Sequence, residues 1–136
     1  MNPLLKNILV VILGFFIGGA LNMLLIKIGP SIIPLPPGID PMDEASLAAN
    51  IHLFEAKNFI MVFLAHALGT LVASFIIARF AASQNMRLAL IPGFFFLIGG
   101  IMMSRMVDAP TWFDALDLLG AYLPMAYLGY LFGRKK

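Results

Sequence analysis

The order of apolar and polar residues divides the chain into four long hydrophobic stretches separated by polar connections. A helix needs about 20 mostly apolar residues to cross the hydrocarbon core of a bilayer, and each stretch reaches that length. We therefore predict an all-α integral membrane protein, a single domain over residues 1–136, in which four transmembrane helices form an up-down-up-down bundle. The predicted spans are 8–28, 58–80, 88–107 and 112–132.

The composition excludes a soluble protein. Hydrophobic residues make up 61% of the chain and charged residues only 12%, which is too little polar surface to cover a soluble core. A cleaved secretory signal is an alternative interpretation of the first stretch, because Lys6 precedes it and small residues lie near Ala20. The apolar run continues past Ala20, however, and the three later spans would anchor the chain in either case.

Positive residues indicate the orientation, because Lys and Arg accumulate in cytoplasmic segments of membrane proteins. The side that carries both termini holds six of the nine: Lys6, Arg79, Arg87, Arg134, Lys135 and Lys136. All seven acidic residues fall on the opposite side or in the opposite half of the membrane. We therefore predict cytoplasmic N and C termini in a multi-pass protein of the inner (cytoplasmic) membrane.

The predicted external loop 29–57 is the one long connection. Closely spaced prolines disfavour a helix, so we expect an extended apolar strap over residues 29–38. Asp40 followed by Pro41 has the pattern of an N-cap and a first helical residue, which predicts a short extra helix beginning near Pro41. A break is expected near Asn50 or near the pair Lys57 and Asn58, where the second span begins.

Short turns make the other helices antiparallel neighbours, and Asp108 or Thr111 is expected to cap the last helix. Helices in lipid pack through small residues that allow close approach. Pro92 and Pro124 are expected to shape or kink their helices. The predicted contact faces carry Gly14, Gly18 and Asn22; Ala65, Gly69 and Ala73; Gly93, Gly100 and Ser104; and Gly129 and Gly133.

Ionisable residues within a span are costly and therefore suggest function. His66 is the deepest of them, and Glu55 precedes it by eleven residues, close to three helical turns, which would put both on one face. Such a pair could form an entry path for a proton or a cation. The alternative is a structural histidine that hydrogen-bonds to a neighbouring helix.

A second candidate cluster lies at the outer ends of the third and fourth spans. Asp114 and Asp117 are three residues apart on one face, and Arg105 lies just across the short turn. These residues could form a structural ion pair, or Arg105 could bind an anion such as a lipid phosphate. A third interpretation is a cation site made by both aspartates and His66, with no spacing that identifies a metal. Asn22 is the polar residue of the first span and completes the candidate site.

The two hairpins show a weak internal similarity. Residues 15–19 (FFIGG) parallel residues 96–100 (FLIGG), and aligning Gly69 with Gly120 then places His66 opposite Asp117. Duplicated hairpins occur in transporters, with sites at the interface of the repeats. A chance recurrence of five apolar letters is the alternative.

Several functional classes find no support in the sequence. The chain contains no nucleotide-binding loop, zinc-protease helix or nucleophile elbow, and we do not expect an enzyme. The spacing of His52 and His66 is like that of haem ligands in membrane cytochromes b, but these are the only histidines, and we predict no cofactor. No basic stripe indicates nucleic acid.

We therefore expect a small transporter- or channel-type protein that works as a homo-oligomer, with a polar site in the outer leaflet. The alternative is a non-catalytic accessory subunit that binds lipid or protein. In that case loop 29–57 would contact a membrane protein partner. Membrane lipids are expected partners in both cases. The candidate site residues are Asn22, Glu55, His66, Arg105, Asp114 and Asp117.

Overall fold

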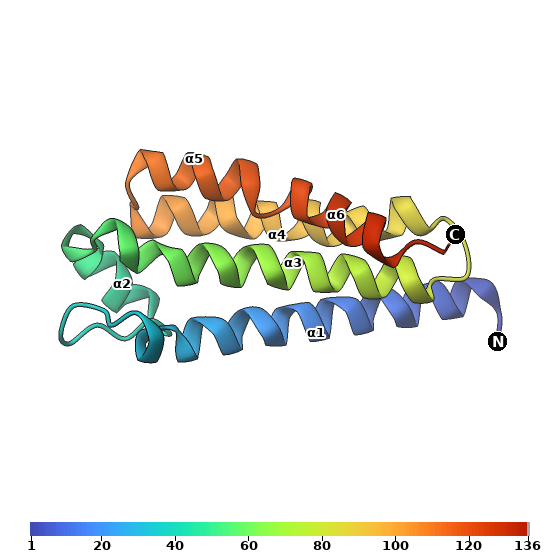
Figure 1. Ribbon diagram of the computed structural model, residues 1–136, viewed down its shortest axis with the longest axis horizontal. Helices are drawn as coiled ribbons and strands as arrows, with labels where there is room; N and C mark the ends of the chain where they lie inside the picture. Colours follow the sequence, from blue (N-terminus) through green and yellow to red (C-terminus); the bar gives the residue numbers. More distant parts are fainter. Residues whose placement is uncertain (136) are drawn as a thin grey trace.

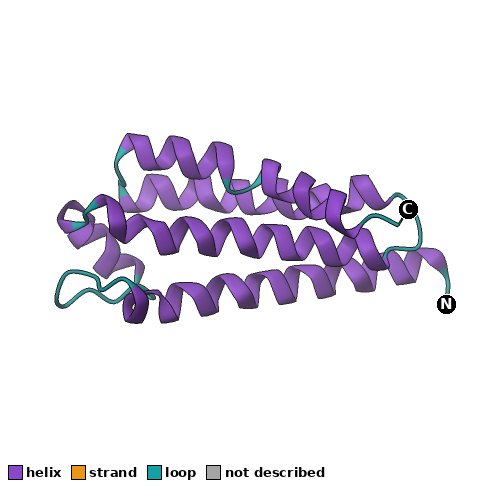
Figure 2. Cartoon of the chain, viewed as in Figure 1, coloured by secondary structure: helices purple, strands orange, loops and turns teal. Residues whose placement is uncertain are grey.

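The computed structural model describes residues 1–135 as helices joined by short connections (Figure 1). Helix accounts for 81% of the residues, and the described part of the chain contains no strand (Figure 2). The α-helices are α1 (Pro3–Ile32), α2 (Glu44–Asn50), α3 (Ile60–Phe80), α4 (Asn85–Val107), α5 (Thr111–Gly120) and α6 (Leu123–Gly133). Two short 3-10 helices, η1 (Ile51–Leu53) and η2 (Ala56–Phe59), precede α3.

Four helical segments are long and apolar enough to cross a membrane: α1, η2 with α3, α4, and α5 with α6. The prediction of an all-helical protein with four such segments is confirmed. Both termini lie at one end of the bundle, and α2 lies at the other (Figure 1). We call these the terminal end and the α2 end.

Helix α3 is the centre of the bundle, because it packs against α1, α4 and α6. A methyl group added at Gly69 of α3 would lie 2.8 Å from the carbonyl oxygen of Gly18 in α1. A methyl group at Gly129 of α6 would lie 2.8 Å from the Cβ atom of Ser74 in α3. Such close approach requires glycine, so the predicted small-residue contact faces are confirmed. These faces meet one another within the chain.

Asparagine side chains hold the helices together at the terminal end. Asn7 of α1 accepts a hydrogen bond from the backbone N–H of Ala82 at 2.8 Å and donates one to the hydroxyl of Ser83 at 3.1 Å. Asn85 donates to the backbone carbonyl of Ala78 at 2.7 Å. These bonds fix the turn between α3 and α4 against the start of α1.

The connection between α1 and α3 begins later than predicted. Helix α1 continues through Pro30 to Ile32, so the expected extended strap starts at Ile33 rather than at Gly29. Proline has no backbone N–H, so the last turn of α1 lacks the hydrogen bond that position 30 would donate to the carbonyl of Ile26. The N–H of Ile33 still donates to the carbonyl of Gly29 at 2.8 Å and closes the last turn.

The short helix of this connection also begins later than predicted. Helix α2 starts at Glu44, and its N-cap is Asp43, whose carboxylate accepts from the N–H of Ala45 at 3.0 Å. The expected start at Pro41 is wrong. Asp40 instead accepts a hydrogen bond from the N–H of Met42 at 2.9 Å, which forms a turn ahead of the helix.

The fourth membrane-spanning segment consists of two helices rather than one. Its first helix, α5, follows Pro110 and has no side-chain cap, so the expected capping by Asp108 or Thr111 is wrong. Asp108 instead ends α4 in the left-handed conformation, with φ of 55°. The interruption between α5 and α6 lies just before Pro124, which lacks a backbone N–H, whereas α4 continues through Pro92.

Candidate functional site

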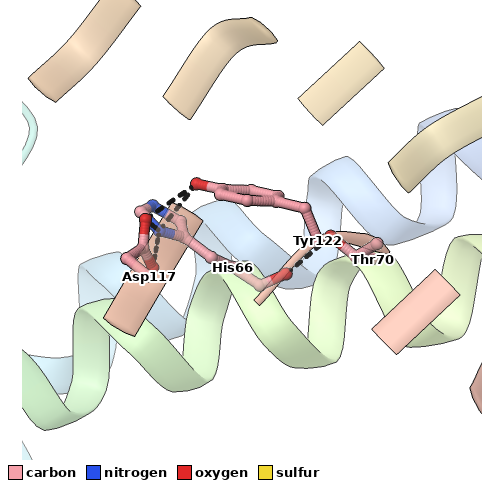
Figure 3. A network of polar contacts seen from close by, with 4 residues as sticks. All are labelled: His66, Thr70, Asp117 and Tyr122. Atoms are coloured by element: carbon pink, nitrogen blue, oxygen red, sulfur yellow. Dashed lines mark hydrogen bonds and ion pairs between the residues drawn. The ribbon is translucent and has the colours of Figure 1, made fainter. Parts of the chain in front are cut away.

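Three polar side chains meet where α3 faces the junction of α5 and α6 (Figure 3). The Nδ1 atom of His66 lies 2.8 Å from Oδ1 of Asp117, and the Tyr122 hydroxyl oxygen lies 3.0 Å from Oδ2 of Asp117. The same hydroxyl is 3.1 Å from Nδ1 of His66. Asp117 and Tyr122 are buried, while the His66 side chain retains 21% exposure. We call these three residues the polar cluster.

Hydrogen-bonding capacity limits where the protons can lie in the polar cluster. An ionised Asp117 carboxylate only accepts, and the Nδ1 atom of His66 then carries a hydrogen while the Tyr122 hydroxyl donates its own. A neutral imidazole then has an unprotonated acceptor at Nε2. Within residues 1–135 no hydrogen bond to this Nε2 atom is found. In this arrangement Asp117 accepts two hydrogen bonds, and the Nε2 atom of a neutral His66 is available as an acceptor.

Tyr122 reaches the polar cluster because the fourth segment breaks beside it. On an unbroken helix, a residue five positions after Asp117 would point about 140° away from it. Tyr122 instead has φ of −112° and ψ of −80°, and its ring stacks on His66 with the ring centroids 5.7 Å apart. Gly100 of α4 provides the space, since a methyl group there would lie 2.6 Å from the Tyr122 hydroxyl oxygen.

The polar cluster lines a cavity of about 410 Å³ between α1 and α4. Phe15 of α1 meets Phe95 and Phe96 of α4 edge to face, at ring-centroid distances of 5.1 and 5.3 Å. From this contact the cavity extends toward the α2 end, along one face of each helix. Its walls are mainly apolar and include Met23 and Ile26 of α1 and Gly99, Met103 and Val107 of α4.

The segment between α1 and α3 covers the cavity at the α2 end. Residues 33–54, which we call the cover segment, contribute Ile33, Leu47 and Phe54 to the lining. Helix α2, which lies within this segment, contacts α4 on the far side. The buried amide of Asn58 donates to the backbone carbonyl of Pro34 at 2.9 Å and thereby ties the cover segment to the start of the second membrane-spanning segment.

Two further polar side chains line the cavity outside the polar cluster. The Asn22 side chain packs near Gly69, and its Oδ1 atom is buried without a hydrogen-bond partner in residues 1–135. Asp114 of α5 is half-buried, and Ser104 of α4 also lines the cavity. The structure thus brings together four of the six predicted site residues: Asn22, His66, Asp114 and Asp117.

Glu55 does not belong to the site. It precedes η2 instead of lying on a helix continuous with His66, and its exposed carboxylate lies 3.2 Å from the Nζ atom of Lys57. The predicted shared face of Glu55 and His66 is therefore wrong. The count of three helical turns between them assumed regular α-helix, whereas this stretch contains a 3-10 turn and an extended residue.

Arg105 also lies outside the site. Its side chain is exposed, and it forms no ion pair within residues 1–135, so the predicted pairing with Asp114 and Asp117 is wrong. Ser104 lines the cavity, and one residue further along a helix the side chain points about 100° away. Proximity in sequence across a short turn did not determine the direction of this side chain.

The sequence did not indicate Tyr122 as a site residue. Ser104 was predicted only as a helix-packing residue, and Asn58 only as a point where the helix breaks. Tyr122 joins the polar cluster only because of the break before Pro124. The available signal was the predicted distortion at this proline, two residues after a tyrosine within an apolar span. No such signal marks the bond of Asn58 to Pro34, because it depends on the path of the cover segment.

The geometry does not favour a metal site. No group of three or more His, Cys, Asp or Glu side chains within residues 1–135 is placed to hold a metal ion. Asp114, Asp117 and His66 line one cavity without converging in that way, so the predicted inorganic cation site of these three residues is not formed.

No protein family, curated protein or solved structure matches this chain. A function is therefore inferred from the cavity and from the side chains that line it. Their arrangement can accept hydrogen bonds from a molecule whose remaining surface is apolar.

Proposed function

We propose that this protein binds a small lipid-soluble molecule with one polar group, which it takes up from the membrane. The observation that carries this proposal is the cavity of about 410 Å³ between α1 and α4. Its walls are mainly apolar, and the polar cluster forms part of its lining. Ligand sites in proteins have this volume and this combination of an apolar lining with a few placed polar groups. The ligand would lie along the apolar walls and place its polar group near His66.

The packing at the terminal end supports binding rather than a permanent pore. The cavity lies on the α2 side of the contact between Phe15 and Phe96. On the other side of this contact, Gly14 approaches Ile77 and Gly133 approaches Ala78 closely enough to exclude any added side chain. Helices α1 and α6 therefore pack closely on α3 at the terminal end.

A transport role remains a second proposal. It is favoured by a cavity that occupies only one half of the bundle and contains His66 and Asp117, two ionisable residues within apolar spans. In that case the structure would correspond to one of two alternating states, and a homo-oligomer would not be needed to complete the site. The cover segment, which is exposed along much of its length, would be the contact for a membrane protein partner in an accessory role.

We further propose that both termini are cytoplasmic and that the cavity lies in the outer half of the inner membrane. The two termini and the turn between α3 and α4 share one end of the bundle, which gathers the majority of the positive residues (Figure 1). The positive-inside rule then assigns this end to the cytoplasm.

Filling the cavity tests the binding proposal. Gly19 and Gly99 line opposite walls, and a methyl group added at either position meets no atom within 4 Å. Gly19→Leu and Gly99→Leu should therefore preserve the fold and occupy the cavity. Ala115→Leu is the matched control, because it adds a leucine on the exposed side of α5, away from the cavity.

The probe is a dodecanol analogue with a photoreactive diazirine, used with protein in phosphatidylcholine nanodiscs. We expect labelling of the cavity faces of α1 and α4 that unlabelled dodecanol displaces. The two glycine variants should reduce this displaceable labelling about tenfold, since a leucine fills much of the space, and Ala115→Leu should not change it. Labelling that is not displaceable, or that is equal in all variants, would overturn the proposal.

A further inference from the structure

The cavity carries negative charge without a basic residue to balance it. Its acidic side chains and its histidine are Glu44, His66, Asp114 and Asp117, and within residues 1–135 no Lys or Arg lines it. Asp117 is neutralised in part by the hydrogen bonds from His66 and Tyr122. Asp114 inside the cavity and Glu44 at the α2 end have no such basic partner. An anionic ligand group would therefore be repelled, and a cationic one attracted.

Three side chains of the cavity offer hydrogen-bond acceptors, beside the Asn22 amide N–H group and the Ser104 hydroxyl, which can donate. The Oδ1 atom of Asn22 is buried without a donor, and the Nε2 atom of His66 lacks one when Nδ1 carries the hydrogen. The carboxylate of Asp114 also only accepts. A buried acceptor without a partner is costly, so a ligand that brings several N–H donors would remove this cost.

We propose that the ligand is a lipophilic primary amine whose protonated ammonium group binds the Asp114 carboxylate in the cavity that Asn22 and His66 also line. This inference rests on the proposed binding function and adds the class of ligand. An ammonium group carries a positive charge and N–H donors, which suit the Asp114 carboxylate and the further acceptors of the cavity. The rings of Phe96, Phe113 and Tyr122 also line the cavity, and aromatic faces attract cations. The alkyl part of the amine would lie along the apolar walls of α1 and α4.

Three probes with one alkyl chain separate the contributions of the chain and of the polar group. Tritiated dodecylamine, dodecanol and dodecanoate are bound to the wild-type protein in phosphatidylcholine nanodiscs at neutral pH, with empty nanodiscs as background. We expect saturable binding of dodecylamine about tenfold tighter than that of dodecanol, because hydrogen bonds to charged groups are the stronger ones. Dodecanoate should bind most weakly.

A matched pair of aspartate variants tests the position of the ammonium group. Asp114→Asn should reduce dodecylamine binding about tenfold and leave dodecanol binding unchanged. Asp108→Asn removes the same charge six residues earlier, at an exposed position that does not line the cavity, and should change neither.

The outcomes distinguish the two proposals. Equal binding of dodecylamine and dodecanol overturns the amine inference and leaves the binding function standing. Equal losses in Asp114→Asn and Asp108→Asn also overturn it, because the amine would then respond to surface charge. If none of the three probes binds saturably, the binding function fails and the amine inference fails with it.

Discussion

The Nδ1 atom of His66 and the Oδ1 atom of Asp117 lie 2.8 Å apart, although 51 positions separate these residues in the chain. The bond joins α3 to α5, two helices that otherwise touch little. It lies within segments that are apolar enough to cross a membrane, where water is not available to replace a lost partner. The pair therefore both fixes α5 in place and orients the imidazole beside the cavity.

Loss of either partner should destabilise the protein. We expect His66→Ala and Asp117→Asn each to lower the free energy of unfolding by about 1–3 kcal/mol, because each leaves a buried polar group without its partner. The double variant should cost less than the sum of the two single variants, because the second change removes a group that is already unpaired. The loss of helical circular dichroism on heating in detergent micelles measures these differences.

Thr70→Val provides the control for this comparison of the single and double variants of His66 and Asp117. The Thr70 hydroxyl is buried and donates to the backbone carbonyl of His66 at 2.8 Å, so it touches the same residue without taking part in the bond to Asp117. Its effect should add to that of Asp117→Asn. Additive effects of His66→Ala and Asp117→Asn would show instead that the two side chains do not interact.

The four long apolar helices could be predicted because a run of about 20 mostly apolar residues is long enough for a helix to cross a bilayer. Whether a helix continues or breaks at a proline could not be predicted from the sequence. Pro92 lies within a continuous α4, whereas the helix breaks before Pro124, and both prolines lie in similar apolar surroundings in the sequence. Which backbone path is taken depends on tertiary packing, here on the space that Gly100 leaves for Tyr122.

The same contrast applies to the candidate site. Asn22, His66 and Asp117 could be recognised because a polar residue within an apolar run is costly and must be satisfied or used. Glu55 and Arg105 lie at helix ends, where a change of helical type or a rotation by one residue redirects a side chain. Their exclusion from the site therefore required the structure.

The cover segment should loosen when its bond to Asn58 is removed. Asn58→Asp keeps the oxygen that accepts from the N–H of Glu55 at 2.8 Å but removes the N–H group that donates to the Pro34 carbonyl. We expect amide hydrogen exchange of residues 33–43 to accelerate about tenfold, because this segment then opens more often. Asn50→Asp is the control, since the Asn50 amide donates to Ser46 within α2. Unchanged exchange in Asn58→Asp would show that the bond does not hold the segment.

The proposed orientation predicts opposite results for reporters at the two ends of the bundle. In a bacterial host, green fluorescent protein fused after the C-terminus should fluoresce, and alkaline phosphatase fused there should be inactive, because the positive residues retain this end in the cytoplasm. Insertion of each reporter at Gly38, which lies in the cover segment with φ of 83°, should give the reverse pattern. Active phosphatase at the C-terminus would mean that the orientation is inverted.

Adjacent glycines of α1 should respond in opposite directions to the same substitution. A methyl group at Gly19 meets no atom within 4 Å, so Gly19→Ala should stabilise the protein by about 0.5–1 kcal/mol through its higher helix propensity. A methyl group at Gly18 would overlap the carbonyl oxygen of Gly69 and the Cβ atom of Ala73, so Gly18→Ala should destabilise it by about 1–3 kcal/mol. Thermal melts followed by circular dichroism compare the two. Both substitutions add one methyl group to neighbouring positions of α1, so the difference between their melting temperatures reports the packing of α1 on α3. Equal shifts in melting temperature would show that these helices do not approach so closely.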